Sequence, residues 1–402
     1  MSLLAALKHY HEKTSDPHHE IEYRLVSWGE IYPPFISDRE HSDSARVIFN
    51  DFPFKLFSVS TPYSELPQKL ALTFQAPEQK RDYEGTTHIS TFADEIAKEY
   101  AALMALITRR RIFAIKQTRI NGLPIEEELK IYQGTHHQER QRLREIDPDR
   151  INNLLKNLLA MDPELARGFM LAARLYHSAI EMLFTEPEFS YLYLVMSLEA
   201  ISSMAYKDFK LEYEEIDQFL DSSYSDWRKL CNISDKQSKD AVVRMLLAKE
   251  HFTSRKFKRF VIDNLPDTFW TEAEDDAKPD YYESMIVPGP NGHGIEQVTR
   301  ARKVISDLEK VDREKLNGTL NSIYQARSDL VHMGKPLPRS IVVGLYRGIP
   351  TEAFAAILNA SLKKGQTGDQ LSSLKLEIPP LLTFERMVSY SMVEFLRKYE
   401  RP

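Results

Sequence analysis

The pattern of apolar residues changes near residue 149, and this change limits the folds that the chain can adopt. Before it, short runs that alternate apolar and polar residues are separated by prolines, which is typical of β-strands. After it, apolar residues recur every three or four positions over long stretches, which indicates one helix after another. The sequence therefore predicts an α+β protein, with a mixed α/β N-terminal domain at residues 1–148 and an all-α helical domain at residues 149–402.

The first region combines strands with one strong helix. The helix is expected from Thr91 to Thr108, and a strand from Arg111 to Ile120 follows it and turns at Asn121-Gly122. Four further strands are expected, at residues 21–27, 46–49, 54–60 and 69–75. The helix end carries Arg109-Arg110-Arg111, which with Lys116 and Arg119 beyond it makes the most basic spot in the region. This cluster is either a solvated helix end or a contact for a phosphate backbone, and the sequence leaves both interpretations open.

The second region contains helices with clear start and stop signals. Asp162-Pro163 begins a helix that runs to about residue 184, and the next, at about 187–206, is apolar nearly all round and is expected to be the central buried helix. A basic helix is expected at 235–265, with either a solvated face or a groove for an RNA backbone. Residues 267–298 are acidic and then rich in Pro and Gly, which predicts a mobile loop. Two more helices are expected, at 351–364 and 382–399.

Composition excludes several classes of protein. The chain has 402 residues, of which 42% are hydrophobic and 28% charged, as in ordinary globular proteins. A net charge of −6 does not suggest a general nucleic-acid coat protein, although it allows a local basic cleft. The single cysteine, Cys231, rules out an internal disulfide framework and a Cys-rich metal site, and fits the cytoplasm. No apolar run is long enough to span a bilayer, and we expect no metal or cofactor.

One cation interrupts an apolar stripe in the helical run that starts near Arg300. Arg327 lies where another leucine would be expected, and a guanidinium cannot lose its charge, so its burial requires a partner. His332 follows five residues later, in the last turn before Gly334, where the helix dipole favours an imidazolium. An arginine can hold a phosphate while a histidine moves protons near neutral pH. The apolar residues of the stripe are Leu316, Leu320, Ile323, Tyr324 and Val331.

Glu199 is the natural partner for Arg327. It lies inside the apolar helix at 187–206, on a stripe with Leu192, Val195 and Met196, where a carboxylate must be paired or protonated. We therefore expect Glu199 to face Arg327. The pair either fixes the register of two helices or orients Arg327 toward a phosphate, and the two roles are compatible.

The sequence from Arg327 to His332, an Arg-x4-His pattern late in a long helix, resembles the signature of the HEPN superfamily (higher eukaryotes and prokaryotes nucleotide-binding). Leu330-Val331-His332-Met333-Gly334 and Ser197-Leu198-Glu199-Ala200-Ile201 resemble its ApeA-like branch. The resemblance covers residues 151–400 and implies a HEPN-like helical bundle. Family members usually have Asn, Asp or His after the arginine, whereas this chain has Ser328. Two other pairs have a similar spacing, Arg81 with His88 and Arg244 with His251, and the second stays a rival because both side chains would share one helix face.

The resemblance implies a metal-independent endoribonuclease with Arg327, His332 and Glu199 at its catalytic centre. It also implies a homodimer with a composite active site, and a bacterial stress, toxin or antiviral defence role with an antitoxin or defence-system partner. RNA contacts are expected from Arg244, Lys249, Arg255 and Lys335. The alternative is a non-catalytic helical module that binds nucleotide, RNA or a protein. The sequence does not identify the RNA, the activating signal or what residues 1–148 recognise.

Overall fold

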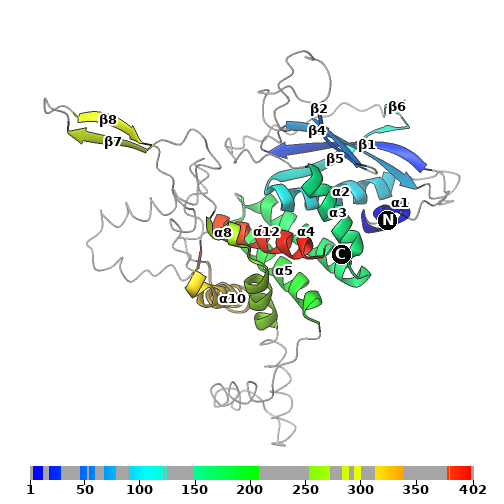
Figure 1. Ribbon diagram of the computed structural model, residues 1–402. Coiled ribbons are helices and arrows are strands. Elements are labelled where there is room, and N and C mark those ends of the chain that lie inside the picture. The colour runs from blue at the N-terminus through cyan, green and yellow to red at the C-terminus, as the bar shows by residue number, and fades with distance from the viewer. Residues whose placement is uncertain are drawn as a thin grey trace, which may run out of the picture.

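A computed structural model shows an α+β protein, as the sequence predicts, with one main antiparallel sheet and a larger helical part (Figure 1). The structure describes residues 3–11, 18–28, 46–51, 54–58, 68–77, 90–121, 123–124, 148–183, 185–207, 253–271, 283–288, 294–299, 313–337, 378–379 and 381–399. The rival pair Arg244 and His251, together with Lys249, lies outside these residues. So does the helix expected at 351–364.

The main sheet has six strands in the order β2-β3-β4-β1-β5-β6, and every neighbouring pair is antiparallel. Its central strand, β1, alternates Ile21, Tyr23 and Leu25 in the core with less buried residues between them, which is the period-two pattern of a sheet with one covered face. All the strands expected from the sequence are present. Their bounds are β1 His18–Trp28, β2 Arg46–Asp51, β3 Phe54–Ser58, β4 Gln68–Pro77, β5 Arg111–Ile120 and β6 Leu123–Pro124.

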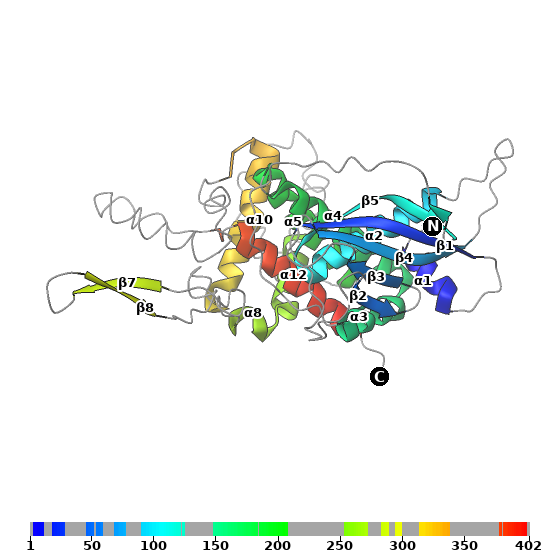
Figure 2. The same cartoon turned by 90° about the horizontal axis from the view of Figure 1, so that it is seen from above.

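Helix α2 (Ser90–Thr108) lies between the sheet and the helical part (Figures 1 and 2). It packs against β5 and also against α4, and α1 (Leu3–His11) lies beside it, where the Leu3 amide donates to the Glu99 carboxylate over 2.6 Å. The predicted turn at Asn121 is confirmed, since Asn121 has a φ of 47° and joins β5 to β6. The buried residues of the sheet, α2 and the later helices form one hydrophobic cluster, so the core continues across residue 148.

The helical part begins as the sequence predicts. Asp162 caps α4, accepting hydrogen bonds from the amides of Glu164 and Leu165. Helices α4 and α5 pack closely because the Ser190 and Ser197 hydroxyls donate to carbonyls of α4, those of Ala179 and Ala172. The remaining elements include a helix over residues 253–264 and end with α12. The bounds are α3 Pro148–Ala160, α4 Pro163–Met182, α5 Pro187–Ala205, α8 Asp267–Thr271, η1 Arg313–Lys315, α10 Leu316–Met333 and α12 Leu381–Arg397.

Two predictions about this part are wrong. The central buried helix is α12 and not α5, because α5 exposes Phe189, Met196 and Met204 on one face, whereas most residues of α12 are buried. The loop expected at 267–298 contains α8 and a two-stranded hairpin of β7 (Glu283–Pro288) and β8 (Gly294–Thr299), so residues 149–402 are not all-α. The acidic and Pro-rich composition concealed two short alternating runs on either side of a segment rich in Pro and Gly. None of the described helices is long and apolar enough to cross a membrane.

Candidate functional site

Helix α10 carries both residues of the Arg-x4-His pattern and rests on α5. Leu320 and Ile323 are fully buried, and the Tyr191 hydroxyl of α5 donates to the Ile323 carbonyl over 3.2 Å. Gly334 ends the helix with a left-handed φ of 63°, as predicted. The predicted stripe is only partly correct, because Val331 is 50% exposed. Helix α10 therefore leaves the core over its last two turns, where the pattern lies.

The expected ion pair between Arg327 and Glu199 is present. Arg327 Nη2 lies 3.4 Å from Glu199 Oε2, and the side chains are 23% and 15% exposed. The guanidinium also lies 5.9 Å from the ring centroid of Tyr324. Burial raises the pKa of the Glu199 carboxyl, although the charge of Arg327 and a hydrogen bond with Tyr324 oppose this shift. The pair lies at a half-buried position between α5 and α10, where burial and the charge of Arg327 shift the pKa of the Glu199 carboxyl in opposite directions.

This ion pair does not satisfy all of its own polar atoms. Glu199 Oε1 and Arg327 Nε are both buried, and neither has a hydrogen-bond partner among the described residues. A buried polar atom without a partner is unfavourable by about 1–3 kcal/mol. Glu199 and Arg327 thus keep one acceptor and one donor that a ligand or a repositioned side chain can use.

His332 is exposed in the last turn of α10, between Val331 and Met333, which are 50% and 55% exposed. It makes no hydrogen bond or ion pair with the residues that the structure describes. Five residues of helix rotate a side chain by about 140° from Arg327 and displace it by about 7.5 Å along the axis. The structure therefore places His332 near the ion pair along α10 but on another face of the helix.

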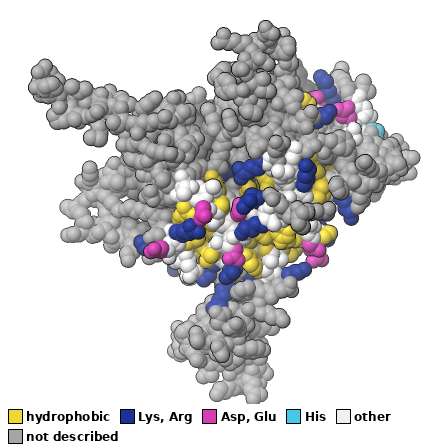
Figure 3. Space-filling model, viewed as in Figure 1, with side chains coloured by type: hydrophobic (Ala, Val, Ile, Leu, Met, Phe, Trp, Pro, Cys, Tyr) yellow, Lys and Arg dark blue, Asp and Glu magenta, His cyan; other side chains and the backbone are white. Residues whose placement is uncertain are grey.

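The residues expected to contact RNA are only partly described. Arg255 is half-buried on the helix over residues 253–264. The Lys335 side chain is 59% exposed, and its Nζ lies 3.2 Å from Asp329 Oδ2, so this lysine forms an ion pair at the C-terminal end of α10. Figure 3 shows Lys and Arg side chains mixed with acidic and hydrophobic ones on the described face, without one continuous basic field. Within the described ranges, no group of three or more His, Cys, Asp or Glu could hold a metal ion.

Both interpretations of the cluster Arg109-Arg110-Arg111 are wrong. Arg110 and Arg111 are only 2% and 4% exposed, so the cluster is neither a solvated helix end nor an open phosphate contact. Arg109 Nε and Nη2 donate to the Glu385 carboxylate of α12 over 2.6–3.1 Å. The Tyr176 hydroxyl donates to the same carboxylate.

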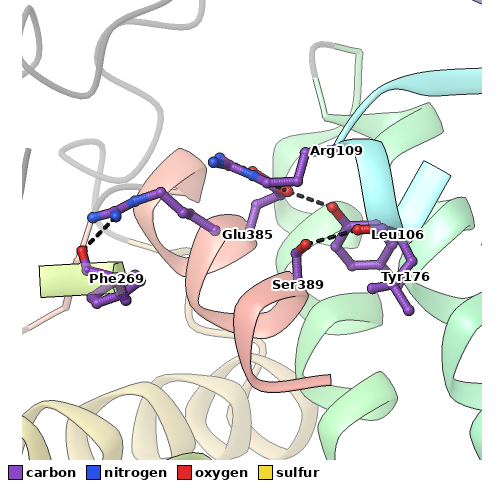
Figure 4. A network of polar contacts seen from close by, with 7 residues as sticks. Leu106, Arg109, Tyr176, Phe269, Glu385 and Ser389 are labelled. Atoms are coloured by element: carbon purple, nitrogen blue, oxygen red, sulfur yellow. Dashed lines mark hydrogen bonds and ion pairs between the residues drawn. The ribbon is translucent and has the colours of Figure 1, made fainter. Parts of the chain in front are cut away.

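Figure 4 shows Glu385 and Ser389 of α12 directed toward Arg109, Leu106 and Tyr176, with Phe269 on the opposite side of the helix. Ser389 donates to the Leu106 carbonyl over 2.8 Å. On that opposite side Arg386, fully buried, donates to the Phe269 carbonyl over 2.8 Å and stacks on its ring. This network was not predicted from the sequence. A usable signal was present, because Glu385-Arg386 interrupts an apolar helix just as Arg327 does.

Comparison of the chain with protein-family models, with curated proteins and with solved structures gives no match.

Proposed function

We propose that this chain is a metal-independent endoribonuclease of the HEPN type, with Arg327, His332 and Glu199 at its catalytic centre. The observation that carries the proposal is the ion pair between Glu199 and Arg327. Its 3.4 Å contact leaves a carboxylate oxygen and a guanidinium nitrogen unsatisfied, one turn before an exposed histidine. An arginine held in this way can turn part of its donor set toward a phosphate without losing its carboxylate.

The proposed reaction uses the substrate's own 2′-hydroxyl. The 2′-oxygen forms a bond to the adjacent phosphorus, the bond from phosphorus to the 5′-oxygen breaks, and the products are a 2′,3′-cyclic phosphate end and a 5′-hydroxyl end. His332 takes the proton of the 2′-hydroxyl or gives one to the leaving 5′-oxygen. Arg327 stabilises the extra negative charge on the phosphorane-like transition state, and Glu199 keeps the guanidinium in place.

A second copy of the chain completes the proposed site. Arg327 and His332 point away from each other along α10, so one copy does not direct both at the same phosphate. The surface around His332 suits such a contact, because Val331 and Met333 expose 50% and 55% of their surface beside it. We therefore propose a homodimer in which α10 lies at the interface, within a helical bundle of the HEPN kind. A role in bacterial stress, toxin or antiviral defence, with a partner that restrains the enzyme, follows from the family resemblance.

The test compares single substitutions in the purified full-length chain on a mixed RNA pool with a chelator present. His332→Ala is expected to reduce cleavage by about 10²–10⁴-fold while the melting temperature is retained, because His332 is exposed. Mass spectrometry of the products is expected to show cyclic phosphate ends. Cleavage that persists in His332→Ala and disappears in His251→Ala would move the site to the rival pair. Absence of cleavage by the wild-type dimer would remove the enzyme proposal.

A second candidate is a non-catalytic module that binds RNA, nucleotide or a partner protein. The observation in its favour is that Arg327 is already engaged by Glu199, whereas His332 contacts neither of them. Such a module would bind RNA without cleaving it, and His332→Ala would then leave every measured property unchanged.

A further inference from the structure

Lys258 is a half-buried cation with a neutral partner. It lies on the helix over residues 253–264, and its ammonium donates to the Asn321 side-chain carbonyl of α10 over 2.8 Å. Burial lowers the pKa of Lys258, and the positive charge of Arg255, one turn earlier on the same helix, lowers it further. In the described part of the chain, no carboxylate lies within ion-pair distance of Lys258.

Unlike Lys258, several other cations on these two helices or at their ends have carboxylate partners. Arg259, the next residue, pairs with Asp263 over 2.7 Å, and Arg327 and Lys335 also have carboxylate partners. A half-buried ammonium beside a second cation is unfavourable until an anion neutralises it. Asn321 is exposed, and because its oxygen accepts from Lys258, its two amide protons are available to another acceptor.

This group is joined to the proposed catalytic centre through two aromatic rings. The rings of Phe257 and Tyr324 lie 5.8 Å apart, and Tyr324 lies under the Arg327 guanidinium. Asn321 and Arg327 are six residues apart on α10, which is about 9 Å along the helix axis.

We propose that Lys258, Asn321 and Arg255 form an anion subsite that binds a backbone phosphate of RNA close to the phosphate held at Arg327. This inference rests on the proposed function for the identity of the nucleic acid. The subsite supplies an ammonium, an amide and a guanidinium, and phosphate oxygens accept hydrogen bonds from all three. It reads no base and no 2′-hydroxyl, so it binds DNA and RNA strands alike and positions the strand without choosing the sequence.

The experiment measures binding of the full-length chain to two uncleavable probes, a single-stranded 2′-O-methyl RNA and a DNA of the same sequence. The dissociation constant is measured over a range of salt concentration. Lys258→Met is expected to weaken binding of both probes roughly tenfold at low salt. It is also expected to reduce the slope of log K against log salt by about one unit, because one phosphate contact is lost.

Two further variants separate a lost contact from a damaged fold. Lys256→Met is the matched control, since Lys256 lies two residues away, about 200° round the same helix, and is expected to keep the wild-type slope. Asn321→Asp retains Lys258 and gives it a carboxylate partner, so it is expected to reduce binding at least as much as Lys258→Met. Melting temperatures of all three are compared with that of the wild type.

The outcomes are distinct from those of the cleavage assay. Binding with an unchanged slope in Lys258→Met and in Asn321→Asp would overturn the subsite and leave the ribonuclease proposal intact. Absence of any binding to either probe would also overturn the subsite. A reduced slope on both probes, in a chain that cleaves no RNA, would support the subsite and remove the enzyme proposal.

Discussion

Two ion pairs join distant helices of this molecule, and they are built in different ways. Glu385 of α12 accepts hydrogen bonds from Arg109 and from Tyr176, and the Glu385 and Arg109 side chains are only 5% and 12% exposed. Glu199 of α5 meets Arg327 of α10 in a single 3.4 Å contact, and each leaves a buried atom unsatisfied. The first pair is saturated with partners, whereas the second is not.

We propose that this difference corresponds to a difference in role, which is structural for the pair at Glu385 and functional for the pair at Glu199. A saturated buried pair has no capacity for a ligand, and removing either member leaves a charge without a partner in the core. An unsaturated pair at a half-buried position can accept another group without being broken. The backbone agrees, because Arg109 has a φ of 56°, an uncommon conformation for an arginine that the contact with Glu385 helps to hold.

The largest effect is expected from Glu385→Ala. This substitution leaves Arg109 and the Tyr176 hydroxyl without their shared acceptor, so the free energy of unfolding should fall by about 3–5 kcal/mol. Urea unfolding followed by circular dichroism measures the change. We expect the N-terminal sheet and the helical part to be destabilised together, because the contact joins the end of α2 to α12 and α4.

A second glutamate on the same helix provides the control for Glu385. Glu394 pairs with Arg397 over 2.7 Å, but Arg397 is 59% exposed. Glu394→Ala should therefore change the free energy of unfolding by less than about 1 kcal/mol. Equal losses in Glu385→Ala and Glu394→Ala would show that saturation and burial do not distinguish the ion pairs of this chain.

Tyr176→Phe removes one hydrogen bond to Glu385 and leaves its ion pair with Arg109 in place. The hydroxyl donates to the Glu385 carboxylate, and burial raises the pKa of Tyr176 well above its usual value, so the group stays protonated. Its removal should lower the free energy of unfolding by about 1.5–3 kcal/mol. Tyr100→Phe is the matched control, because the Tyr100 hydroxyl is buried with no hydrogen-bond partner among the described residues. That substitution should be neutral or stabilising.

Most of the fold could be predicted from the sequence, because the signals for strands and helix starts lie within short stretches of the chain. Alternating apolar residues gave β1 to β5, and Asp162-Pro163 gave the start of α4. The extent to which each helix is buried could not be predicted, since it depends on the elements that pack against it. Helix α5 is apolar nearly all round, yet part of its apolar surface is exposed. Helix α12 can bury Glu385 and Arg386 because Arg109 and Tyr176 donate to Glu385 and the Phe269 carbonyl accepts from Arg386.

The candidate site was accessible in part for the same reason. A cation in an apolar stripe predicted a carboxylate partner, and Glu199 was the carboxylate inside the apolar stripe of the helix at 187–206, so the pair with Arg327 could be inferred. The burial of the arginines at 109–111 could not be predicted, since no local pattern shows that the turn after α2 packs against α12. The contact of Lys258 with Asn321 is likewise invisible until two helices are packed together.

Arg327→Met examines the unsaturated pair. Both side chains are partly exposed and share one contact, so the free energy of unfolding should fall by only about 1 kcal/mol. The proposed ribonuclease activity should fall by at least about 10²-fold, because the charge proposed to stabilise the phosphate is removed. Arg109→Met should give the reverse, a larger loss of stability with wild-type activity per folded molecule. Activity that follows stability in both variants would remove the distinction between the two pairs.

The smallest effect concerns the dependence of stability on pH at Glu199. Burial raises the pKa of Glu199 in the fold, so its contribution to stability is present below the unfolded pKa and is lost as pH rises through the folded value. The glutamine in Glu199→Gln does not titrate. Arg327 loses its counter-charge in this variant, but the guanidinium stays charged at every pH measured, so it adds no dependence on pH. The wild type should therefore lose stability relative to Glu199→Gln as pH rises above the ordinary glutamate pKa of about 4.3, measured as the difference in urea midpoint. If the wild type instead gains stability relative to Glu199→Gln as pH rises, the charge of Arg327 stabilises the Glu199 carboxylate by more than burial destabilises it.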